Sequence, residues 1–357
     1  MSREREREEI DSLVETLKRL QKEYYVNGRI SVPDREYDGL FDRLQSLEHE
    51  FPDLIRDDSP TQRVGSDLSQ EFPEVEHSVP VLSLDKCYSV DEIFKWTAKV
   101  QDTAGQPLSF VLEEKIDGAS IVLYYEQGRL IRAVTRGNGL VGNDITGNVR
   151  TIRDVPLMLT RPLTLSCRGE IFLPKRLFEE LNSKMEIPYA NPRNLAAGTL
   201  RRIRSSEVAR IPLDIFIYEG YMVERCATHL EILGDLNDLG FKLNPNMGFF
   251  TDREEFRHLA GVRPSWRFGS LSDMKSFVEE ELKERDTLDY EIDGLVLKVN
   301  EIPVRDDLGY TGHHPRWAVA YKFESPVGKT VVRNIEVQIG RTGRATPVAR
   351  VSPVRIS

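Results

Sequence analysis

Cysteine is scarce in this sequence, and long apolar runs are missing from it. The three cysteines (Cys87, Cys167 and Cys226) lie far apart without Cys-x-x-Cys spacing, which argues against a disulfide framework or a zinc site and fits a reducing compartment. No stretch of apolar residues is long enough to predict a membrane span. The first ten residues are mostly charged, where a signal peptide would be apolar, so we expect a cytoplasmic protein.

Basic residues do not outnumber acidic residues in this sequence. The chain has 49 Lys and Arg against 58 Asp and Glu, a net charge of −9. Any surface that binds nucleic acid must therefore be local. The 357 residues, 39% hydrophobic and 30% charged, are typical of a globular protein with two or three domains.

Apolar residues at three- and four-residue steps predict two helices in the first sixty residues. One stripe runs from Ile10 to Tyr24, a turn is expected at Asn27-Gly28, and a second stripe runs from Tyr37 to Leu47. The segment from Ser31 to Asp34 is typical of a helix start. We expect a small helical hairpin, followed by a proline-containing connector over about residues 52–80.

After Ser109 the sequence changes to short β-rich runs. Strands are predicted at Phe110–Leu112, Ile121–Tyr125 and Leu130–Thr135, with a hairpin turn at Gln127-Gly128. Further strands are predicted at Leu163–Cys167, Leu213–Tyr218 and Gly294–Val299, and helices at Lys175–Met185 and Leu271–Glu284. This mixture predicts an α+β domain built on antiparallel sheets. Residues 327–357 carry six basic side chains against one acidic side chain and alternate β-forming residues, as in the opening strands of a small barrel.

The sharpest local feature is the segment from Glu113 to Gly118. On a strand, residues two apart share a face, so Glu113, Lys115 and Asp117 would point into one space. A lysine between carboxylates is most often a salt-bridge cluster, whereas a lysine nucleophile must lose its proton, which burial or nearby cations favour. The motif alone leaves both interpretations open.

Three further segments follow in order: Arg168–Ile171, Glu291–Lys298 and Trp317–Phe323. With the Lys115 motif, this series resembles the covalent nucleotidyltransferases, namely DNA ligases, RNA ligases and mRNA-capping enzymes, which place AMP or GMP on the motif lysine. Attack on an α-phosphate depends on positioning and on neutralising the phosphate oxygens, for which Lys298 and Lys322 are suitable point charges.

Segments outside these motifs narrow the choice among the nucleotidyltransferase families. Along essentially its whole length, the chain resembles NAD⁺-dependent DNA ligases. The matching segments are Tyr24-Tyr25, Val32–Asp38, Ser59–Gly65, Pro80–Asp85, Thr135–Gly137, Asn191–Gly198, His314–Trp317, Val337–Gly343 and Thr346–Arg350. The resemblance implies an α+β fold with a helical NAD⁺-binding domain at 1–68. It also implies an antiparallel-sheet nucleotidyltransferase (adenylation, ATP-grasp-like) domain at 69–324 and the incomplete start of an OB-type barrel at 325–357.

The family implies that Lys115 attacks NAD⁺ to give enzyme-AMP and nicotinamide mononucleotide (NMN), with Mg²⁺ as cofactor and no zinc in this portion. Besides Lys115, the residues implied in the chemistry are Asp117, Arg136, Lys298 and Lys322. The implied NMN contacts are Tyr24, Tyr25, Asp34, Tyr37 and Asp38. The implied contacts to the rest of NAD⁺ are Ser83, Leu84, Glu113, Ile116, Glu170, Arg193, Arg201, Tyr218, Arg285 and Asp293. The implied Mg²⁺ ligands are Asp117, Glu170 and Asp293.

The residues by themselves also allow plainer roles. Tyr218 suits adenine stacking or a core position at a strand end, Tyr24 and Tyr37 suit a core, and Asp34 suits a helix start. The sequence departs from the family pattern at three places. Tyr25 replaces a histidine, Asn138 replaces an aspartate near the phosphates, and Arg204-Ser205 replaces an Asp-Pro pair.

We therefore expect the adenylation portion of a monomeric, cytoplasmic NAD⁺-dependent DNA ligase whose partners are NAD⁺ and nicked duplex DNA, with no membrane association. The complete enzyme would seal 5′-phosphate/3′-hydroxyl nicks during replication and repair, and this chain alone would seal them poorly. Two alternatives are a lysine nucleotidyltransferase that uses ATP or GTP, and a non-catalytic DNA-binding relic.

Overall fold

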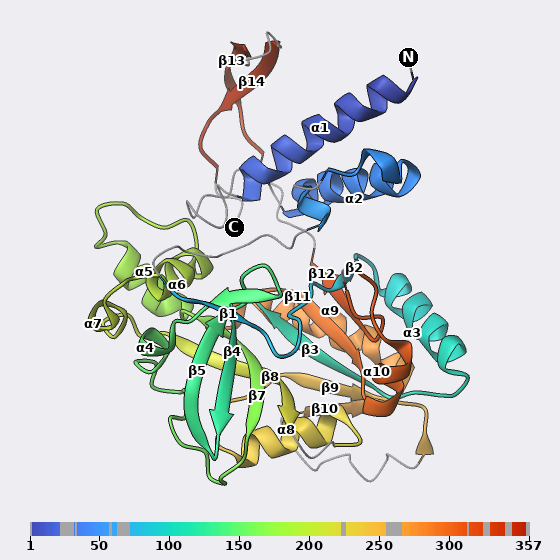
Figure 1. Ribbon diagram of the computed structural model, residues 1–357, viewed down its shortest axis with the longest axis vertical. Coiled ribbons are helices and arrows are strands. Elements are labelled where there is room, and N and C mark those ends of the chain that lie inside the picture. The colour runs from blue at the N-terminus through green and yellow to red at the C-terminus, as the bar shows by residue number, and fades with distance from the viewer. Residues whose placement is uncertain are drawn as a thin grey trace.

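A computed structural model describes residues 2–21, 32, 34–56, 59–62, 72–222, 226–254, 266–312, 314–323, 329–339 and 345–354. Figure 1 shows a body of two sheets with surrounding helices, a pair of helices above it, and a two-stranded hairpin beside that pair. None of the helices in these ranges is long and apolar enough to cross a bilayer. All three cysteines are unpaired thiols.

The amino-terminal unit consists of helices α1 (Ser2–Gln21) and α2 (Asp34–Glu50), as the apolar spacing predicts. They pack through a small core at the predicted stripe positions, namely Ile10, Val14, Leu17, Leu44 and Leu47. Two short 3₁₀ helices follow, Pro52–Leu54 and Pro60–Gln62. The turn predicted at Asn27-Gly28, the helix-start residues Ser31 and Pro33, and Tyr24 and Tyr25 lie outside the described residues.

One sheet of the body has four antiparallel strands in the order β5-β4-β7-β8. They are β4 (Ala119–Glu126), β5 (Arg129–Thr135), β7 (Leu165–Phe172) and β8 (Asp214–Met222). The β4–β5 turn has positive φ at Gln127 (48°) and Gly128 (77°), which suits the right-handed twist of a tight hairpin. The strands and the hairpin predicted here are confirmed.

The other sheet has six strands in the order β10-β9-β3-β11-β12-β2. They are β2 (Asp85–Cys87), β3 (Phe110–Ile116), β9 (Met247–Phe250), β10 (Trp266–Gly269), β11 (Ile292–Val299) and β12 (Ala318–Lys322). Its centre is antiparallel, but β10 pairs with β9, and β2 with β12, in parallel. The prediction of purely antiparallel sheets is wrong at these two edges, because each parallel pair joins strands connected by a long excursion of the chain rather than by a tight turn.

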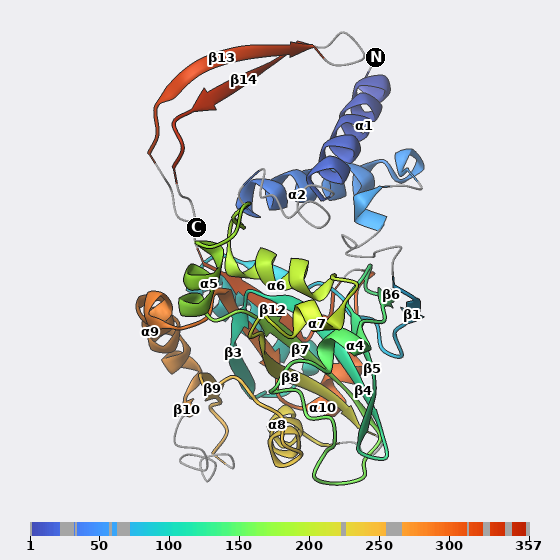
Figure 2. The ribbon, with the colours of Figure 1, turned by 90° about the vertical axis from the view of Figure 1, so that its left-hand side faces the viewer.

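Helices cover the sheets, as Figures 1 and 2 show. The predicted helices are present as α5 (Lys175–Asn182), shorter than expected, and as a 3₁₀ turn, Leu271–Asp273, running into α9 (Met274–Glu284). The others are α3 (Val90–Ala104), α4 (Thr146–Val149), α6 (Pro192–Leu200), α7 (Ser205–Val208), α8 (His229–Asp238), the 3₁₀ turn Arg285–Thr287 and α10 (Ile302–Leu308). A small two-stranded sheet pairs β1 (Glu74–Glu76) with β6 (Val141–Asn143).

Each large sheet lines its own apolar core. One core lies between the four-stranded sheet and helices α4 to α8, and the other between the six-stranded sheet and helices α3, α9 and α10. The short link from β3 to β4 passes from one sheet to the other. The residues at the carboxyl end of β3, including Lys115, therefore lie where the two sheets meet.

The basic carboxyl-terminal segment forms a hairpin of β13 (Val332–Ile339) and β14 (Ala345–Val351), which projects from the body in Figure 2. Its side chains are largely exposed, among them Val332, Ile335 and Val337. The predicted strands are confirmed. Since two strands do not define a barrel, the OB-type architecture remains a prediction.

Candidate active site

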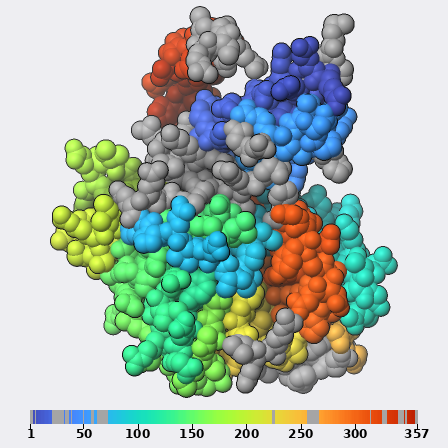
Figure 3. Space-filling model, viewed as in Figure 1, coloured from blue at the N-terminus to red at the C-terminus, as the bar shows by residue number. Residues whose placement is uncertain are grey.

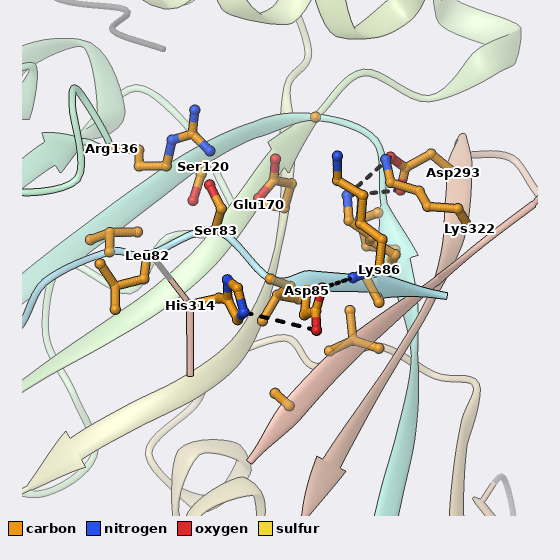
Figure 4. Close-up of a pocket in the computed structure, with 18 of the residues that line it drawn as sticks. Leu82, Ser83, Asp85, Lys86, Ser120, Arg136, Glu170, Asp293, His314 and Lys322 are labelled. Carbon is orange, nitrogen blue, oxygen red and sulfur yellow. Dashed lines mark hydrogen bonds and ion pairs between the residues drawn. The ribbon is translucent and has the colours of Figure 1, made fainter. Parts of the chain in front are cut away.

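A cavity of about 560 Å³ is lined by residues of both the helical unit and the body (Figure 4). Figure 3 shows the helical unit, in blue, above the body. Helices α1 and α2 contribute Leu20, Tyr37 and Phe41 to its wall. The segment that follows them contributes residues 80–86, and the two sheets supply the remaining wall. The cavity is therefore bounded by parts of the chain that the sequence assigns to two different domains.

Lys115 lies near the end of β3 and forms an ion pair across the sheet junction. Its Nζ is 2.8 Å from Oδ1 and 3.0 Å from Oδ2 of Asp293, which lies on the neighbouring strand β11. Nζ of Lys322, on β12, is 2.7 Å from Oδ2 of the same carboxylate. Burial would raise the pKa of Asp293, but the two lysines outweigh it and hold that pKa below its usual range.

The residues that follow Lys115 make the crossing between the sheets. Asp117 lies just past the end of β3, where its backbone N–H donates to the carbonyl of Glu291 and its carboxylate is ion-paired with Arg193. Gly118 passes so close to β7 that a Cβ there would lie 2.3 Å from the carbonyl oxygen of Ile171. A side chain at this position would push β7 away from the start of β4. The Gly118 position therefore requires glycine for close approach.

Glu113 and Lys298 form another part of the cavity wall. Nζ of Lys298 is 2.9 Å from Oε2 of Glu113 and 2.8 Å from the carbonyl oxygen of Tyr218, and it lies 5.2 Å from the centroid of the Tyr218 ring. Burial would raise the pKa of Glu113, but Lys298 and His229 outweigh it and lower that pKa. A carboxylate, a fixed ammonium and an aromatic ring are thus held together beside the cavity.

Glu170, on β7, lies between Arg136 and the Asp293–Lys322 pair in the view of Figure 4. Burial raises the pKa of Glu170 to about 7, and the opposing effects of Arg193 and Lys115 do not restore it to its usual value.

Arg136 begins a tight turn that leads into β6. Gly137 has φ of +59°, and a Cβ there would lie 1.8 Å from the carbonyl oxygen of Val141. Oδ1 of Asn138 accepts hydrogen bonds from the backbone N–H groups of Leu140 (3.0 Å) and Val141 (2.8 Å). Asn138 therefore has a structural role in its own turn, which an aspartate at this position could also fill.

Most of the predicted site residues line this one cavity. They are Tyr37, Ser83, Leu84, Glu113, Lys115, Ile116, Arg136, Glu170, Arg193, Arg201, Tyr218, Asp293, Lys298 and Lys322. Arg285 instead lies after α9, with its guanidinium 5.5 Å from the centroid of the Phe323 ring. The backbone of Asp34 and Asp38 belongs to α2, but their side chains, like Tyr24 and Tyr25, lie outside what the structure describes.

Other residues around the cavity were not predicted. Asp85, Lys86 and His314 line it, and His314 Nε2 is 3.8 Å from Oδ2 of Asp85 (Figure 4). Asp85 and His314 lie within segments that resemble the family, and this resemblance could have identified them as cavity residues. Behind the wall, His229 and Arg305 are almost completely buried. A single histidine or arginine in a sequence does not indicate that its side chain is buried behind a cavity.

The three carboxylates predicted as Mg²⁺ ligands are not assembled into a metal site. Asp117 is ion-paired with Arg193 and Asp293 with two lysines. Within the described ranges, no three His, Cys, Asp or Glu side chains are grouped so that they could hold a metal ion. The arrangement does not fit a Mg²⁺ site made of protein ligands alone.

Comparisons with known proteins agree with this geometry. Residues 69–326 match the NAD-dependent DNA ligase adenylation domain, and residues 3–65 match the DNA ligase-like, N-terminal NAD⁺-binding domain. The chain therefore belongs to the NAD-dependent DNA ligase family, and its body has the nucleotidyltransferase-like adenylation fold, with helices around antiparallel and mixed sheets.

Relatives covering nearly all of this chain are DNA ligases. Those of Borrelia garinii subsp. bavariensis and Borreliella burgdorferi are 44% and 45% identical over 351 residues, which is 98% of this chain and 51% of each relative. The chain thus spans about half the length of these relatives. One solved structure with a partly similar fold is the ATP-dependent DNA ligase from bacteriophage T7 in complex with ATP. The match covers 74% of this chain and 80% of that chain, at 14% identity and a TM-score of 0.31.

Proposed function

We propose that the chain transfers AMP from NAD⁺ to its own Lys115. The observation that carries this proposal is the position of the Lys115 and Lys322 ammonium groups. Both bind Asp293 at the wall of a cavity that also includes Tyr37 of the helical unit. A nucleophile, a second cation and a surface from the NAD⁺-binding domain are thus present in one space.

In the proposed reaction, the Lys115 ammonium group gives one proton to water, and the resulting amine nitrogen forms a bond to the adenylyl phosphorus of NAD⁺ and releases a second proton to water. The bond from that phosphorus to the bridging pyrophosphate oxygen breaks, and NMN leaves. This chemistry needs positioning and neutralisation of phosphate charge more than acid–base catalysis. Arg136, Arg193, Arg201, Lys298 and Lys322 supply the positive charge. Asp117 positions Arg193 through their ion pair.

We assign the remaining cavity residues to the ligand. The aromatic ring of Tyr218 and the side chains of Glu113 and Ile116 suit the adenine, and Glu170 suits the ribose. Ser83 and Leu84 would contact the AMP half, and Tyr24, Tyr25, Asp34, Tyr37 and Asp38 the NMN half. The contact of Arg285 with the ligand and the use of Mg²⁺ as a cofactor remain predictions. The ATP-grasp-like likeness, the OB-type start, the monomeric state and the cytoplasmic location also remain predictions.

The proposed units are 1–68, 69–324 and 325–357, and the family matches over 3–65 and 69–326 support the first two. In a longer protein, AMP would pass from Lys115 to the 5′-phosphate of a nick in duplex DNA, and the 3′-hydroxyl would displace it. The named DNA ligases of similar sequence support this assignment.

The test is the mass of the intact protein after incubation with Mg²⁺ and either NAD⁺ or ATP. We expect one added AMP from NAD⁺ and no appreciable addition from ATP, because the leaving group is recognised by the helical unit. Lys115→Ala should abolish the addition, while Lys184→Ala, an exposed lysine paired with Glu180, should not change it. Equal labelling by ATP would favour the alternative of an ATP-dependent nucleotidyltransferase, and no labelling by either would favour a non-catalytic relic.

A further inference from the structure

A buried ionic cluster lies directly behind Glu113 and Lys298. His229, the first residue of α8, is completely buried, and its Nε2 lies 2.6 Å from Oε1 of Glu113. Its Nδ1 lies 3.4 Å from Oε1 of Glu219. Arg305 completes the cluster, with Nη1 3.2 Å from Oε2 of Glu219. His229 and Arg305 are behind the cavity wall, whereas Glu113, Glu219 and Lys298 form part of it.

The surrounding backbone fixes the position of the His229 ring. The backbone N–H of His229 donates to the carbonyl of Asn300, at 2.7 Å. The preceding Thr228 and the following Glu231 form a capping box that holds the start of α8. On the far side, Nε of Arg305 donates to the carbonyl of Val299, at 2.6 Å, and its guanidinium lies 4.4 Å from the Trp317 ring. A ring held in this way can in turn hold the carboxylate that it contacts.

The two oxygens of Glu113 are divided between two partners. A carboxylate oxygen only accepts hydrogen bonds, so Nε2 of His229 carries the proton in the 2.6 Å contact with Oε1. The other oxygen, Oε2, accepts from Lys298 at 2.9 Å. The Lys298 ammonium also donates to the Tyr218 carbonyl, and it lies 3.3 Å from Nε2 of His229 and 3.9 Å from Oε2 of Glu219. Rotation of the Glu113 carboxylate would therefore withdraw the shortest charged contact that holds this ammonium group.

We infer that His229 is a positioning residue for nucleotide transfer, which holds Glu113 and, through it, the ammonium group of Lys298. This inference rests on the proposed function, in which Lys298 neutralises phosphate charge. His229 itself does not line the cavity. Its loss should therefore affect the rate at saturating NAD⁺ through the orientation of Lys298, and not through a lost contact with the ligand.

Two variants of His229 separate positioning from simple packing. An asparagine amide can place its nitrogen near the position of Nδ1 and leaves Glu113 without its donor, whereas a glutamine amide can reach toward the position of Nε2. We expect His229→Asn to lower the rate of AMP addition at saturating NAD⁺ by about tenfold or more, and His229→Gln to stay within about threefold of the parent.

Leu233→Ala is the matched control, because Leu233 is buried on the same helix but packs in a different cluster with Val111, Met247 and Phe249. It should lower the thermal midpoint while leaving the rate per folded molecule within about twofold. If all three variants lost activity only in proportion to their loss of folded protein, His229 would do no more than fill space. That result would overturn the inference.

A double-mutant cycle gives the sharpest test. If His229 acts through Glu113, His229→Asn should cost nothing further in a Glu113→Ala background, so the two effects should be strongly non-additive. Additive effects on the rate constant would contradict the inference while leaving the proposed function intact. If the parent chain gained no AMP from NAD⁺, the proposed function would fail and this inference with it.

Discussion

Lys115 and Asp293 are joined through both oxygens of the carboxylate, with Nζ of Lys115 2.8 Å from Oδ1 and 3.0 Å from Oδ2. Lys322 binds the same carboxylate at 2.7 Å. One carboxylate therefore holds two ammonium groups near each other, although like charges would otherwise separate them. Asp293 sets the position of the proposed nucleophile before any ligand is bound.

Asp293→Asn should therefore slow AMP addition from NAD⁺. The amide keeps the size of the side chain but loses the charge that holds both lysines. We expect a decrease of about tenfold to a hundredfold at saturating NAD⁺, since a charge-assisted hydrogen bond contributes about 1.5–3 kcal/mol. The measurement is a rapid-mixing time course followed by intact mass. An unchanged rate would show that Lys115 needs no such anchor.

Tyr37→Ala should weaken the use of NAD⁺ in both directions. Tyr37 lines the cavity from α2 and stacks near Phe41, with their ring centroids 6.2 Å apart. Loss of one ring contact to NMN should lower the rate of AMP addition, and also the reverse release of AMP by NMN, by about tenfold. Ser46→Ala, at an exposed position of the same helix, is the control. A forward loss without a reverse loss would contradict an NMN contact.

His77→Ala should disturb Arg136 without touching the cavity. Nε2 of His77 is 3.1 Å from the carbonyl oxygens of both Thr135 and Arg136, and Nδ1 is 3.1 Å from the Tyr124 hydroxyl. Removal of the ring releases the start of the Arg136 turn, and we expect AMP addition to fall by about tenfold. Tyr124→Phe, which removes only the hydroxyl, should fall by about threefold or less. Equal losses in both variants would place the effect in the Tyr124 contact instead.

Arg204→Asp should stabilise the protein. Arg204 is the N-cap of α7, has extended φ and ψ (−96° and 113°), and makes no side-chain cap hydrogen bond. An aspartate there can accept from the first-turn N–H groups, so the free energy of unfolding should rise by about 0.5–1 kcal/mol. Urea denaturation of this variant and of Arg204→Ala, which gains no cap, measures the difference. No gain over the alanine variant would contradict the cap assignment.

The buried carboxyl of Glu281 should make stability depend on pH. Burial, and then the neighbouring Glu114, raise the pKa of Glu281 to about 8, from 4.5 for an ordinary glutamate. The folded protein therefore keeps a proton that the unfolded chain releases. The stabilisation from this group is complete below about pH 4.5 and is lost as the pH rises through about 8.

Glu281→Gln keeps a neutral side chain at every pH, so its stability relative to the parent should increase between about pH 5 and about pH 9. Urea denaturation at several pH values measures this difference. The exposed neighbour Glu279 provides the control variant Glu279→Gln, which should follow the parent. Parallel pH profiles for parent and Glu281→Gln would show that Glu281 is ionised in the folded protein.

The sequence predicts well what depends on local pattern. The stripes from Ile10 and Tyr37 become α1 and α2, and Gln127-Gly128 becomes the hairpin turn. Helix α3 was not predicted, although its signals are in the sequence, since Ser89 caps its start and Gly105, with φ of 65°, ends it. Apolar residues also recur at helical steps over Val90–Ala104, with Ile93 and Val100 buried, so the capping residues and the periodicity both indicate this helix.

Pairings between distant segments could not be predicted from residue spacing. Glu113, Lys115 and Asp117 were expected to share one space, yet they bind His229, Asp293 and Arg193, each from a different element. The parallel edges of the six-stranded sheet and the cluster around His229 likewise depend on topology. The family resemblance identified most of the cavity residues, because members of one family share the same topology. Asn138 is explained by the hydrogen bonds of its own turn.

The segment from Glu74 to Cys87 joins both halves of the body. It pairs with Val141–Asn143 next to the Arg136 turn, and then runs parallel to β12, which carries Lys322. Arg168 fastens it midway by donating to the carbonyls of Val79 and Pro80. Since its partners come much later in the chain, this stretch gains its contacts only after they have been synthesised and placed. We therefore expect its docking to be a late event in folding, so that the ligand wall formed by residues 80–86 is completed after both sheets.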